Sequence, residues 1–469
     1  MKTSKKIIAV FLTLVMLGSI TACSSQTNSG TTGTTTAAKT ETDDTTVAAG
    51  TEEIYFLNFK PEIAEVYEKI ASDYKAETGV TVKVVTAASN TYESTLRAEI
   101  TKKDAPTIFQ INGPVGYQNW TEYCADLKDT ELYSHLSDKS LAVTSGDGVY
   151  GIPYVVEGYG IIYNNAVMDK YFALSDKAVD ISSADKITDF ATLKAVVEDM
   201  TLHKEELGIE GVFAATSMGA GEQWRWQTHL ANLPFYYEFK EAASYDSTIL
   251  AGLAAEEVEF KYAENYKNTF DLYINNSCVE KGLLGSKSVD DSMADFALGK
   301  CAMVQNGNWA WAQISQVDGN TVLEEDIKFM PIYTGMPEDS KQGLCIGTEN
   351  YFAINNAVSE EKQQASMDFL NWLFTSETGK AYVINELGFI APFDTFEEDE
   401  KPADPLAREV LAWMEKDTTA VEWTFASFPS EEFKNYFGDA LLEYVQGSME
   451  WDEVVTIVKD SWKAEKTAN

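Results

Sequence analysis

Large aromatic side chains stand in segments that the sequence predicts to be loops, where a ligand can reach them. Trp224 and Trp226 follow the glycine-rich run 218–223. Trp309 comes directly after a predicted strand, and Phe59 lies between a predicted strand and a helix. An indole or phenyl ring offers a flat apolar face to a ligand, so the chemistry expected here is binding by stacking. We expect one platform from the pair Trp224 and Trp226, or two if the segment is helical.

The sequence carries no motif typical of catalysis or metal binding. Gly-x-Ser-x-Gly, the phosphate-binding loop and His-Glu-x-x-His do not occur. His135, His203 and His229 are far apart, so we expect no imidazole-based metal site and no cofactor. With 74 acidic residues, paired carboxylates arise by chance and do not identify a glycoside hydrolase. An enzyme is therefore the less favoured interpretation.

The formal net charge of −38 limits the class of partner. Such a surface repels nucleic acid and anionic lipid headgroups, and it favours a neutral or cationic ligand over an anionic one. We therefore expect no nucleic-acid partner and no contact with the membrane surface through the folded part of the chain.

Five cysteines occur, and four lie in the main body of the chain: Cys124, Cys278, Cys301 and Cys345. Four cysteines allow three pairings, and the sequence does not choose among them. None has Cys-x-x-Cys spacing, so we favour four free thiols that pack as small apolar residues over two disulfides.

The N-terminus reads as an export signal. Lys2, Lys5 and Lys6 precede an apolar stretch, 7–17, which is too short to cross a bilayer core of about 30 Å as a helix. Ile20-Thr21-Ala22-Cys23 then resembles the lipobox of bacterial lipoproteins. The resemblance implies a signal peptide over 1–22 and a lipid on the Cys23 thiol, which would place the protein at the outer face of the cell membrane. A plain secretory signal with an incidental cysteine is the alternative.

Residues 23–51 are predicted to form a flexible tether. From 24 to 50 the chain is rich in Thr, Ser, Gly and Ala and has no aromatic residue, so it cannot bury enough apolar surface to fold. A tether of this length spans roughly 28 Å root-mean-square.

The body of the chain predicts an α/β fold that would position the loop residues. A buried strand at 54–57 is followed by a helix over 61–78 that ends at Gly79, and then by an alternating strand at 80–84. Another apolar strand covers 107–111. Strands and helices that alternate at this spacing predict βαβ units and a mainly parallel sheet. Ligands bind beyond the carboxyl ends of such strands, which points to the loops that carry Phe59 and Asn112.

Four segments carry a resemblance to a known family. They are Asp104-Ala105-Pro106-Thr107-Ile108-Phe109-Gln110, then 151–164 with Gly-Ile-Pro-Tyr and Ile-Tyr-Asn, then 296–309 with Phe-Ala-Leu-Gly-Lys and Gly-Asn-Trp, and finally 365–378 with 388–392. Their order and spacing resemble the carbohydrate-binding, family 1 (maltose-binding-protein-like) group of extracellular solute-binding proteins that serve bacterial ABC importers. The resemblance covers residues 52 to about 463.

The resemblance implies a two-lobed periplasmic-binding-protein-like fold of type II, with hinged lobes and a ligand cleft between them. The division expected is 52–155 for lobe 1, 156–330 for lobe 2, 331–376 for lobe 1 again, and 377–469 for lobe 2 with C-terminal helices. A chain of 469 residues is also long enough to split into more than one core.

The resemblance further implies that the ligand is an oligosaccharide, delivered unchanged by a monomer to ABC permease subunits. Glu157 matches the acidic residue after the first crossing between lobes. Asn112 stands where members that bind maltose have an acidic–basic pair, so maltose itself is in doubt. Asn308 and Lys60 complete the expected polar contacts. Phe433 and Tyr436 on a late helix are expected to serve the core instead.

Two further interpretations share this fold. In the first, the cleft binds a peptide, polyamine or phosphonate, and in the second, the protein holds surface glycans without feeding an importer. The aromatic loops favour a sugar, and the sequence does not identify its monomer, linkage or length.

Overall fold

The computed structural model describes residues 53–88, 91–242, 244–245 and 247–468. All of them fall within one compact unit, Gly50–Asn469. The predicted signal peptide, the lipidation site at Cys23 and the tether lie outside the described residues. In the described part, no helix combines the length and apolar character needed to cross a bilayer.

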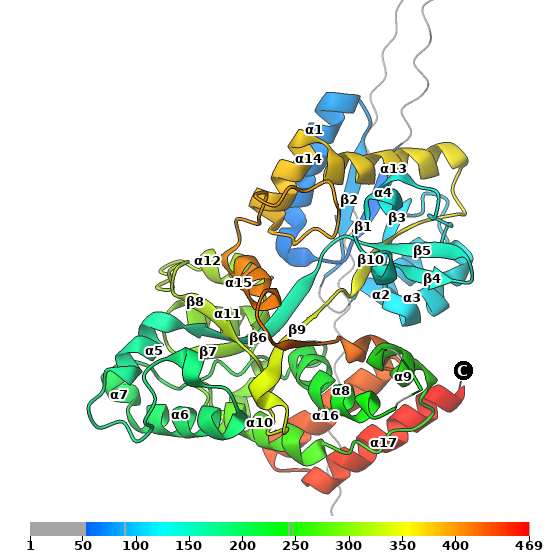
Figure 1. The fold of residues 1–469 in the computed structure, drawn as a ribbon. Helices are drawn as coiled ribbons and strands as arrows, with labels where there is room; N and C mark the ends of the chain where they lie inside the picture. Colours follow the sequence, from blue (N-terminus) through cyan, green and yellow to red (C-terminus); the bar gives the residue numbers. More distant parts are fainter. Residues whose placement is uncertain (1–52, 89–90, 243, 246, 469) are drawn as a thin grey trace, which may run out of the picture. The chain divides into compact units, whose positions relative to one another are not determined.

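A six-stranded sheet with its helices forms what we name lobe 1 (Figure 1). The strand order is β2-β1-β3-β10-β5-β4. The strands are β1 (Ile54–Asn58), β2 (Val82–Thr86), β3 (Ile108–Asn112), β4 (Val143–Ser145), β5 (Gly148–Pro153) and β10 (Asn350–Ile354). The helices are α1 (Ala64–Thr78), α2 (Tyr92–Glu99), α3 (Gly113–Trp120), α4 (Glu131–His135), α13 (Glu360–Thr375) and α14 (Glu377–Tyr382).

The expected βαβ start is present, but the sheet as a whole is mixed. β1 pairs in parallel with both β2 and β3. β10 and β4 each pair antiparallel with β5, because β4 and β5 are joined by a tight turn and β10 returns from the other sheet. Tyr67, Ile70, Ala71 and Tyr74 of α1 recur at helical spacing and are buried, and Gly79 ends the helix with φ +80°.

A five-stranded sheet with its helices forms what we name lobe 2. The strands are β6 (Glu157–Asn164), β7 (Met303–Gly307), β8 (Ile327–Met330), β9 (Gln342–Gly347) and β11 (Thr419–Val421). The helices are α5 (Asn165–Phe172), α6 (Phe190–Leu202), α7 (Lys204–Leu207), α8 (Asn232–Lys240), α9 (Thr248–Ala254), α10 (Ala263–Asn275), α11 (Val289–Ala297), α12 (Ala310–Ser315), α15 (Pro405–Met414), α16 (Glu431–Gln446) and α17 (Trp451–Ala468).

The long strand β6 organises lobe 2. One of its edges pairs with β7, and the other pairs first with β9 and then with β8. Each lobe has its own apolar clusters: Phe56, Tyr67 and Phe352 belong to one in lobe 1, and Trp226 and Phe433 to one in lobe 2. Phe433 is fully buried there, as expected for a core residue, whereas the same expectation is wrong for Tyr436, which is 47 % exposed.

The chain crosses between the lobes by short segments. β5 leads to β6 through 154–156, and β9 leads to β10 through Thr348 and Glu349. A third passage runs near Ile390, which bridges to Val156. β9 pairs with β6 and so belongs to the five-stranded sheet, whereas the expected division assigned 331–376 to lobe 1.

The four described cysteines are free. Cys124, Cys301 and Cys345 are buried, and Cys278 is partly buried. Burial raises the pKa of the Cys124 thiol to about 12 and that of Cys345 to about 12, so both remain neutral thiols at physiological pH.

Candidate functional site

Aromatic rings from distant parts of the sequence gather at one end of the lobe 2 sheet. The ring centroids of Trp224 and Trp309 lie 6.1 Å apart, and those of Trp309 and Trp423 lie 6.5 Å apart at 89°. His229 lies among them, 4.8 Å from Trp224 and 5.5 Å from Trp309. We name these four residues the aromatic cluster. Asn232 holds the segment that carries Trp423. Its side-chain NH2 group donates to the Glu422 carbonyl, and its side-chain oxygen accepts the Phe425 N–H.

Glycines make room for two of these tryptophans. A Cβ added to Gly307 at the end of β7 would lie 2.1 Å from the Trp309 ring. A Cβ added to Gly347 at the end of β9 would lie 2.6 Å from the Trp423 ring. Each ring therefore lies directly over strand backbone, in a position that a larger residue would close.

Asn308 fixes the turn that presents Trp309. Its side-chain oxygen accepts the Gly158 N–H at 2.9 Å, and its own N–H donates to the Gly158 carbonyl at 3.0 Å. Asn308 is buried, so it positions the loop by binding β6. Trp309 then begins α12.

A buried ion pair adjoins the cluster. Lys60 Nζ lies 2.7 Å from Glu157 Oε1, 3.6 Å from Glu62 Oε1 and 5.7 Å from the centroid of the Trp309 ring. Burial alone would lower the pKa of Lys60, but the carboxylates of Glu157 and Glu62 leave it raised above its usual value. Burial raises the pKa of Glu157, and the Lys60 charge opposes that effect.

A second polar group lies where β9 crosses to β10. The Asn112 side-chain amide donates to Glu349 Oε1 at 3.0 Å. Burial raises the pKa of Glu349, and the positive charge of Lys434 opposes it. Lys434 is itself buried and pairs with Glu431 at 2.7 Å. The pairing brings α16 of lobe 2 into the electrostatic surroundings of a lobe 1 strand end.

Six of the twelve buried side-chain polar atoms that lack a hydrogen-bond partner in the described part of the chain lie around the cluster. They are Arg225 Nη1, His229 Nδ1, Gln305 Oε1, Trp309 Nε1, Thr348 Oγ1 and Trp423 Nε1. Burial lowers the pKa of His229 well below its usual value, with Arg225 and Lys434 adding to the effect, so the ring is neutral. Native proteins pair most buried polar atoms, so a group of unpaired ones indicates a place for a polar ligand or ordered water.

The structure brings only some of the predicted residues together. Lys60, Glu157 and Trp309 adjoin one another, and Trp224 joins Trp309 through their rings. Asn308 supports them from behind. Asn112 belongs to the second group, around Glu349.

Two residues predicted for the site instead pack against other residues of their own lobe. Trp226 is 1 % exposed, its Nε1 donates to the carbonyls of Thr216 and Ser217, and it packs in the lobe 2 core. Phe59 packs edge-to-face on Tyr92 with centroids 5.3 Å apart.

Five residues near the site were not predicted from the sequence: Trp423, His229, Arg225, Glu349 and Lys434. The position of Arg225 between two tryptophans is the one sequence signal that pointed to it. Trp423 follows a short strand and belongs to none of the matching segments.

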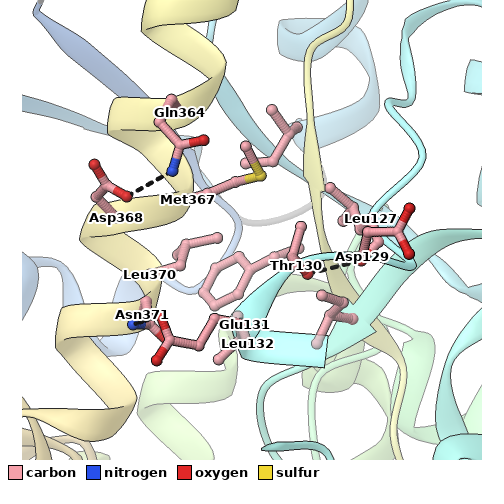
Figure 2. A pocket seen from close by; sticks show the side chains of 13 residues that line it. Leu127, Asp129, Thr130, Glu131, Leu132, Gln364, Met367, Asp368, Leu370 and Asn371 are labelled. Carbon is pink, nitrogen blue, oxygen red and sulfur yellow. Dashed lines mark hydrogen bonds between the residues drawn. The ribbon is translucent and has the colours of Figure 1, made fainter. Parts of the chain in front are cut away.

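A cavity of about 180 Å³ lies elsewhere, in lobe 1 between α13 and the segment that leads into α4 (Figure 2). Met367 and Leu370 of α13 face Leu127 and Leu132 across it, and Asp368 and Glu131 lie at its rim. None of the predicted site residues lines this cavity.

One group within the described residues has ligand atoms close enough to hold a metal ion. Carboxylate oxygens of Asp176 and Glu206 and a ring nitrogen of His203 lie within 4.8 Å of one another. The group is on the α6–α7 side of lobe 2 and includes no member of the aromatic cluster.

Comparisons with known proteins agree with this architecture. A family model described as bacterial extracellular solute-binding protein matches residues 69–435. A chitin oligosaccharide binding protein is 16 % identical, covers 89 % of this chain and 99 % of its own, and superposes with a TM-score of 0.67. A raffinose complex of the solute-binding protein RafE is 17 % identical, with coverages of 89 % and 100 % and a TM-score of 0.65. A sugar transporter from Bacillus licheniformis, bound to stachyose, is 17 % identical, with coverages of 88 % and 100 % and a TM-score of 0.62. A search of curated proteins returns no match.

Proposed function

Because this chain belongs to the bacterial extracellular solute-binding proteins, we propose that it captures an oligosaccharide outside the cell and delivers it unchanged to the permease of an ABC importer. The observation that carries the choice of ligand is the aromatic cluster with its unpaired polar atoms. Sugars combine apolar C–H faces with hydroxyls in the ring plane. Tryptophan platforms and buried hydrogen-bonding groups complement both features.

The ligands of similar structures support this choice. Raffinose and stachyose are bound in two of them, and a third is named for chitin oligosaccharides. We propose Trp309, Trp224 and Trp423 as platforms. Lys60, Glu157 and Glu349 would form hydrogen bonds with the sugar hydroxyls. Asn112, which donates to Glu349, would contribute to the same contact.

Ligand capture would use both lobes. Lys60 follows β1 of lobe 1, whereas Glu157 and Trp309 belong to lobe 2. A sugar that contacts groups from both lobes would favour the closed arrangement over an open one, because only the closed arrangement offers all contacts at once. The permease would then recognise the closed form.

We also propose that Cys23 carries a lipid and that 23–51 tether the folded part to the outer face of the membrane, with the protein acting as a monomer. Mass spectrometry of the N-terminal peptide from membranes would detect a diacylglyceryl adduct. The Cys23→Ala variant is expected in the medium, and its retention in membranes would contradict the anchor.

Calorimetric titration with α- and β-linked oligosaccharides, with peptides and polyamines as comparison ligands, tests the proposed function. We expect saturable binding of one glycan series at micromolar concentration or below. Binding of a peptide or an amine and of no sugar would keep the family and overturn the ligand class. Hydrolysis of the bound glycan, followed by chromatography of the titration mixture, would overturn delivery without chemical change.

A further inference from the structure

Arg225 is a buried cation without an ion-pair partner among the described residues. Its side chain is 1 % exposed, and its Nη1 atom has no hydrogen-bond partner. The other buried basic side chains are satisfied, because Lys60 pairs with Glu157 and Lys434 pairs with Glu431, each at 2.7 Å. An unpaired buried charge is strongly unfavourable. It is expected where a partner for the charge arrives from outside.

The contacts of Arg225 leave one edge of the guanidinium unused. Nε donates to Asn306 Oδ1 at 3.3 Å, and Cζ lies 3.5 Å from the centroid of the Trp224 ring. The stacked tryptophan covers one face and Asn306 engages one donor. The unpaired Nη1 remains beside a ring of the aromatic cluster.

The nearest carboxylates do not neutralise this charge. Burial lowers the pKa of Arg225 to about 9, and Glu222, Glu62 and Asp290 oppose that effect from a distance. Glu222 accepts the Val289 N–H at 2.7 Å. The guanidinium is therefore charged at neutral pH and faces no carboxylate at contact distance in the described part of the chain.

The presence of arginine at this position is informative. Only three of the 36 basic residues are arginines, namely Arg97, Arg225 and Arg408. Lysine provides a flexible point charge, whereas a guanidinium presents parallel N–H groups that match the two oxygens of a carboxylate. A chain that otherwise uses lysine places arginine beside the aromatic cluster.

The unpaired neighbours of Arg225 include more obligate donors than obligate acceptors. Trp309 Nε1 and Trp423 Nε1 can only donate, and Thr348 Oγ1 and His229 Nδ1 can do either. Gln305 Oε1 is the unpaired group that can only accept. A ligand group that satisfies the two indole N–H groups is rich in acceptors, and the unpaired Arg225 cation favours a negatively charged one.

We propose that the cleft is selective for oligosaccharides that contain a uronic acid, with the ligand carboxylate bound at the unused edge of Arg225. This inference rests on the proposed function and narrows its ligand class. The negative surface opposes an anionic ligand only weakly, because the repulsion between charges in solution is largely screened beyond about 8 Å at physiological ionic strength. A contact pair inside a water-excluded site is screened far less.

The test compares acidic and neutral sugars of matched length by calorimetry. Oligogalacturonides and glucuronate-bearing xylo-oligosaccharides are set against galacto-oligosaccharides and unsubstituted xylo-oligosaccharides. We expect the acidic member of a pair to bind at least tenfold more tightly. Arg225→Met should weaken uronate binding about 100-fold, because it removes one side of a buried charged pair, and should weaken neutral-sugar binding much less.

Arg97→Met is the matched control, because Arg97 is exposed and also lies over a tryptophan ring, at 5.6 Å from the centroid of Trp120. It should leave the preference for acidic sugars unchanged. Arg225→Lys keeps the charge but lacks the parallel N–H groups of the guanidinium, so we expect an intermediate loss of uronate affinity. If Arg225→Met does not fold, the test rests on the preference for acidic over neutral sugars, compared between the unaltered protein and Arg225→Lys.

Tighter binding of the neutral member by the unaltered protein, or a preference for the acidic member that survives Arg225→Met, would overturn the inference and leave the sugar receptor standing. Failure to bind any sugar would overturn the proposed function, and the inference with it.

Discussion

Lys60 Nζ and Glu157 Oε1 are 2.7 Å apart although 97 residues separate them, and they join the loop after β1 to the first residue of β6. The side chains of both residues are almost fully buried. The pair therefore links the two sheets within the protein interior, next to Trp309.

Lys60→Met should lower the free energy of unfolding by about 3–5 kcal/mol, because it leaves the Glu157 carboxylate buried without its partner. Adding Glu157→Gln to Lys60→Met should restore part of this loss. Chemical denaturation of the two single variants and the double variant measures the coupling. Lys69→Met is the control, because Lys69 pairs with Glu386 at the surface, and its loss should leave stability nearly unchanged. Equal losses for Lys60→Met and Lys69→Met would contradict the assigned role.

Trp309→Ala should weaken binding of the cognate sugar by roughly 1–3 kcal/mol, about fivefold to 150-fold, because it removes a stacking platform. The fold should survive, since the ring lies at the edge of the core and is partly exposed. Trp372→Ala is the matched control in lobe 1, where Trp372 Nε1 donates to Glu77. Unchanged sugar affinity in a folded Trp309→Ala protein would remove Trp309 from the site.

Gly307→Ala should displace the Trp309 ring, because the added methyl group would lie 2.1 Å from it. We expect a loss of sugar affinity comparable to that of Trp309→Ala, with a changed tryptophan emission spectrum. Gly282→Ala adds the same methyl group where no atom lies within 4 Å, and it should alter neither property. Full affinity in Gly307→Ala would show that the ring position is not needed for binding.

The pH dependence of stability should carry a contribution from Asp404. Burial raises the pKa of this residue to about 7, although its carboxylate accepts the Ala407 N–H at the start of α15. An unfolded aspartate titrates near 3.9, so between about pH 4 and 7 the folded state holds more protons than the unfolded state. Stability from this group therefore rises as the pH falls through that window.

Asp404→Asn removes this titration and keeps a side chain that caps helices well. The slope of unfolding free energy against pH between 4 and 7 should become more positive in the variant, by roughly 4 kcal/mol over the window. An unchanged slope would show that Asp404 titrates normally. Asp126→Asn is a suitable comparison, because backbone hydrogen bonds to Asp126 lower its pKa and it titrates outside this window.

Much of the fold was predictable because it follows from local patterns. The buried strand at 54–57, the helix that ends at Gly79 and the strand that ends before Trp309 each show in the spacing of apolar residues and in a glycine. The mixed strand directions were not predictable, because β10 joins the first sheet after about 240 intervening residues and no local pattern records its direction.

The residues of the candidate site were likewise predictable only where a local pattern marks them. Trp224 and Trp226 look equivalent in sequence, yet Arg225–Leu230 form a helical segment. Residues two apart in a helix lie on roughly opposite faces, which directs Trp226 into the core. The expectation that a helical segment would provide two platforms is therefore wrong. Trp423 meets Trp309 only through tertiary structure, since 114 positions separate them and the contact depends on Asn232.

The two short passages between the lobes have a mechanical consequence. β5 and β10 are antiparallel neighbours in one sheet, and β6 and β9 are antiparallel neighbours in the other, so the three-residue and two-residue passages run side by side. At no more than about 3.6 Å per residue, neither passage has slack for one lobe to slide past the other. The relative motion that the two passages still allow is a rotation of one lobe against the other about these adjacent segments. Glu349 belongs to the two-residue passage itself, so a rotation about the passages would displace it little relative to either lobe.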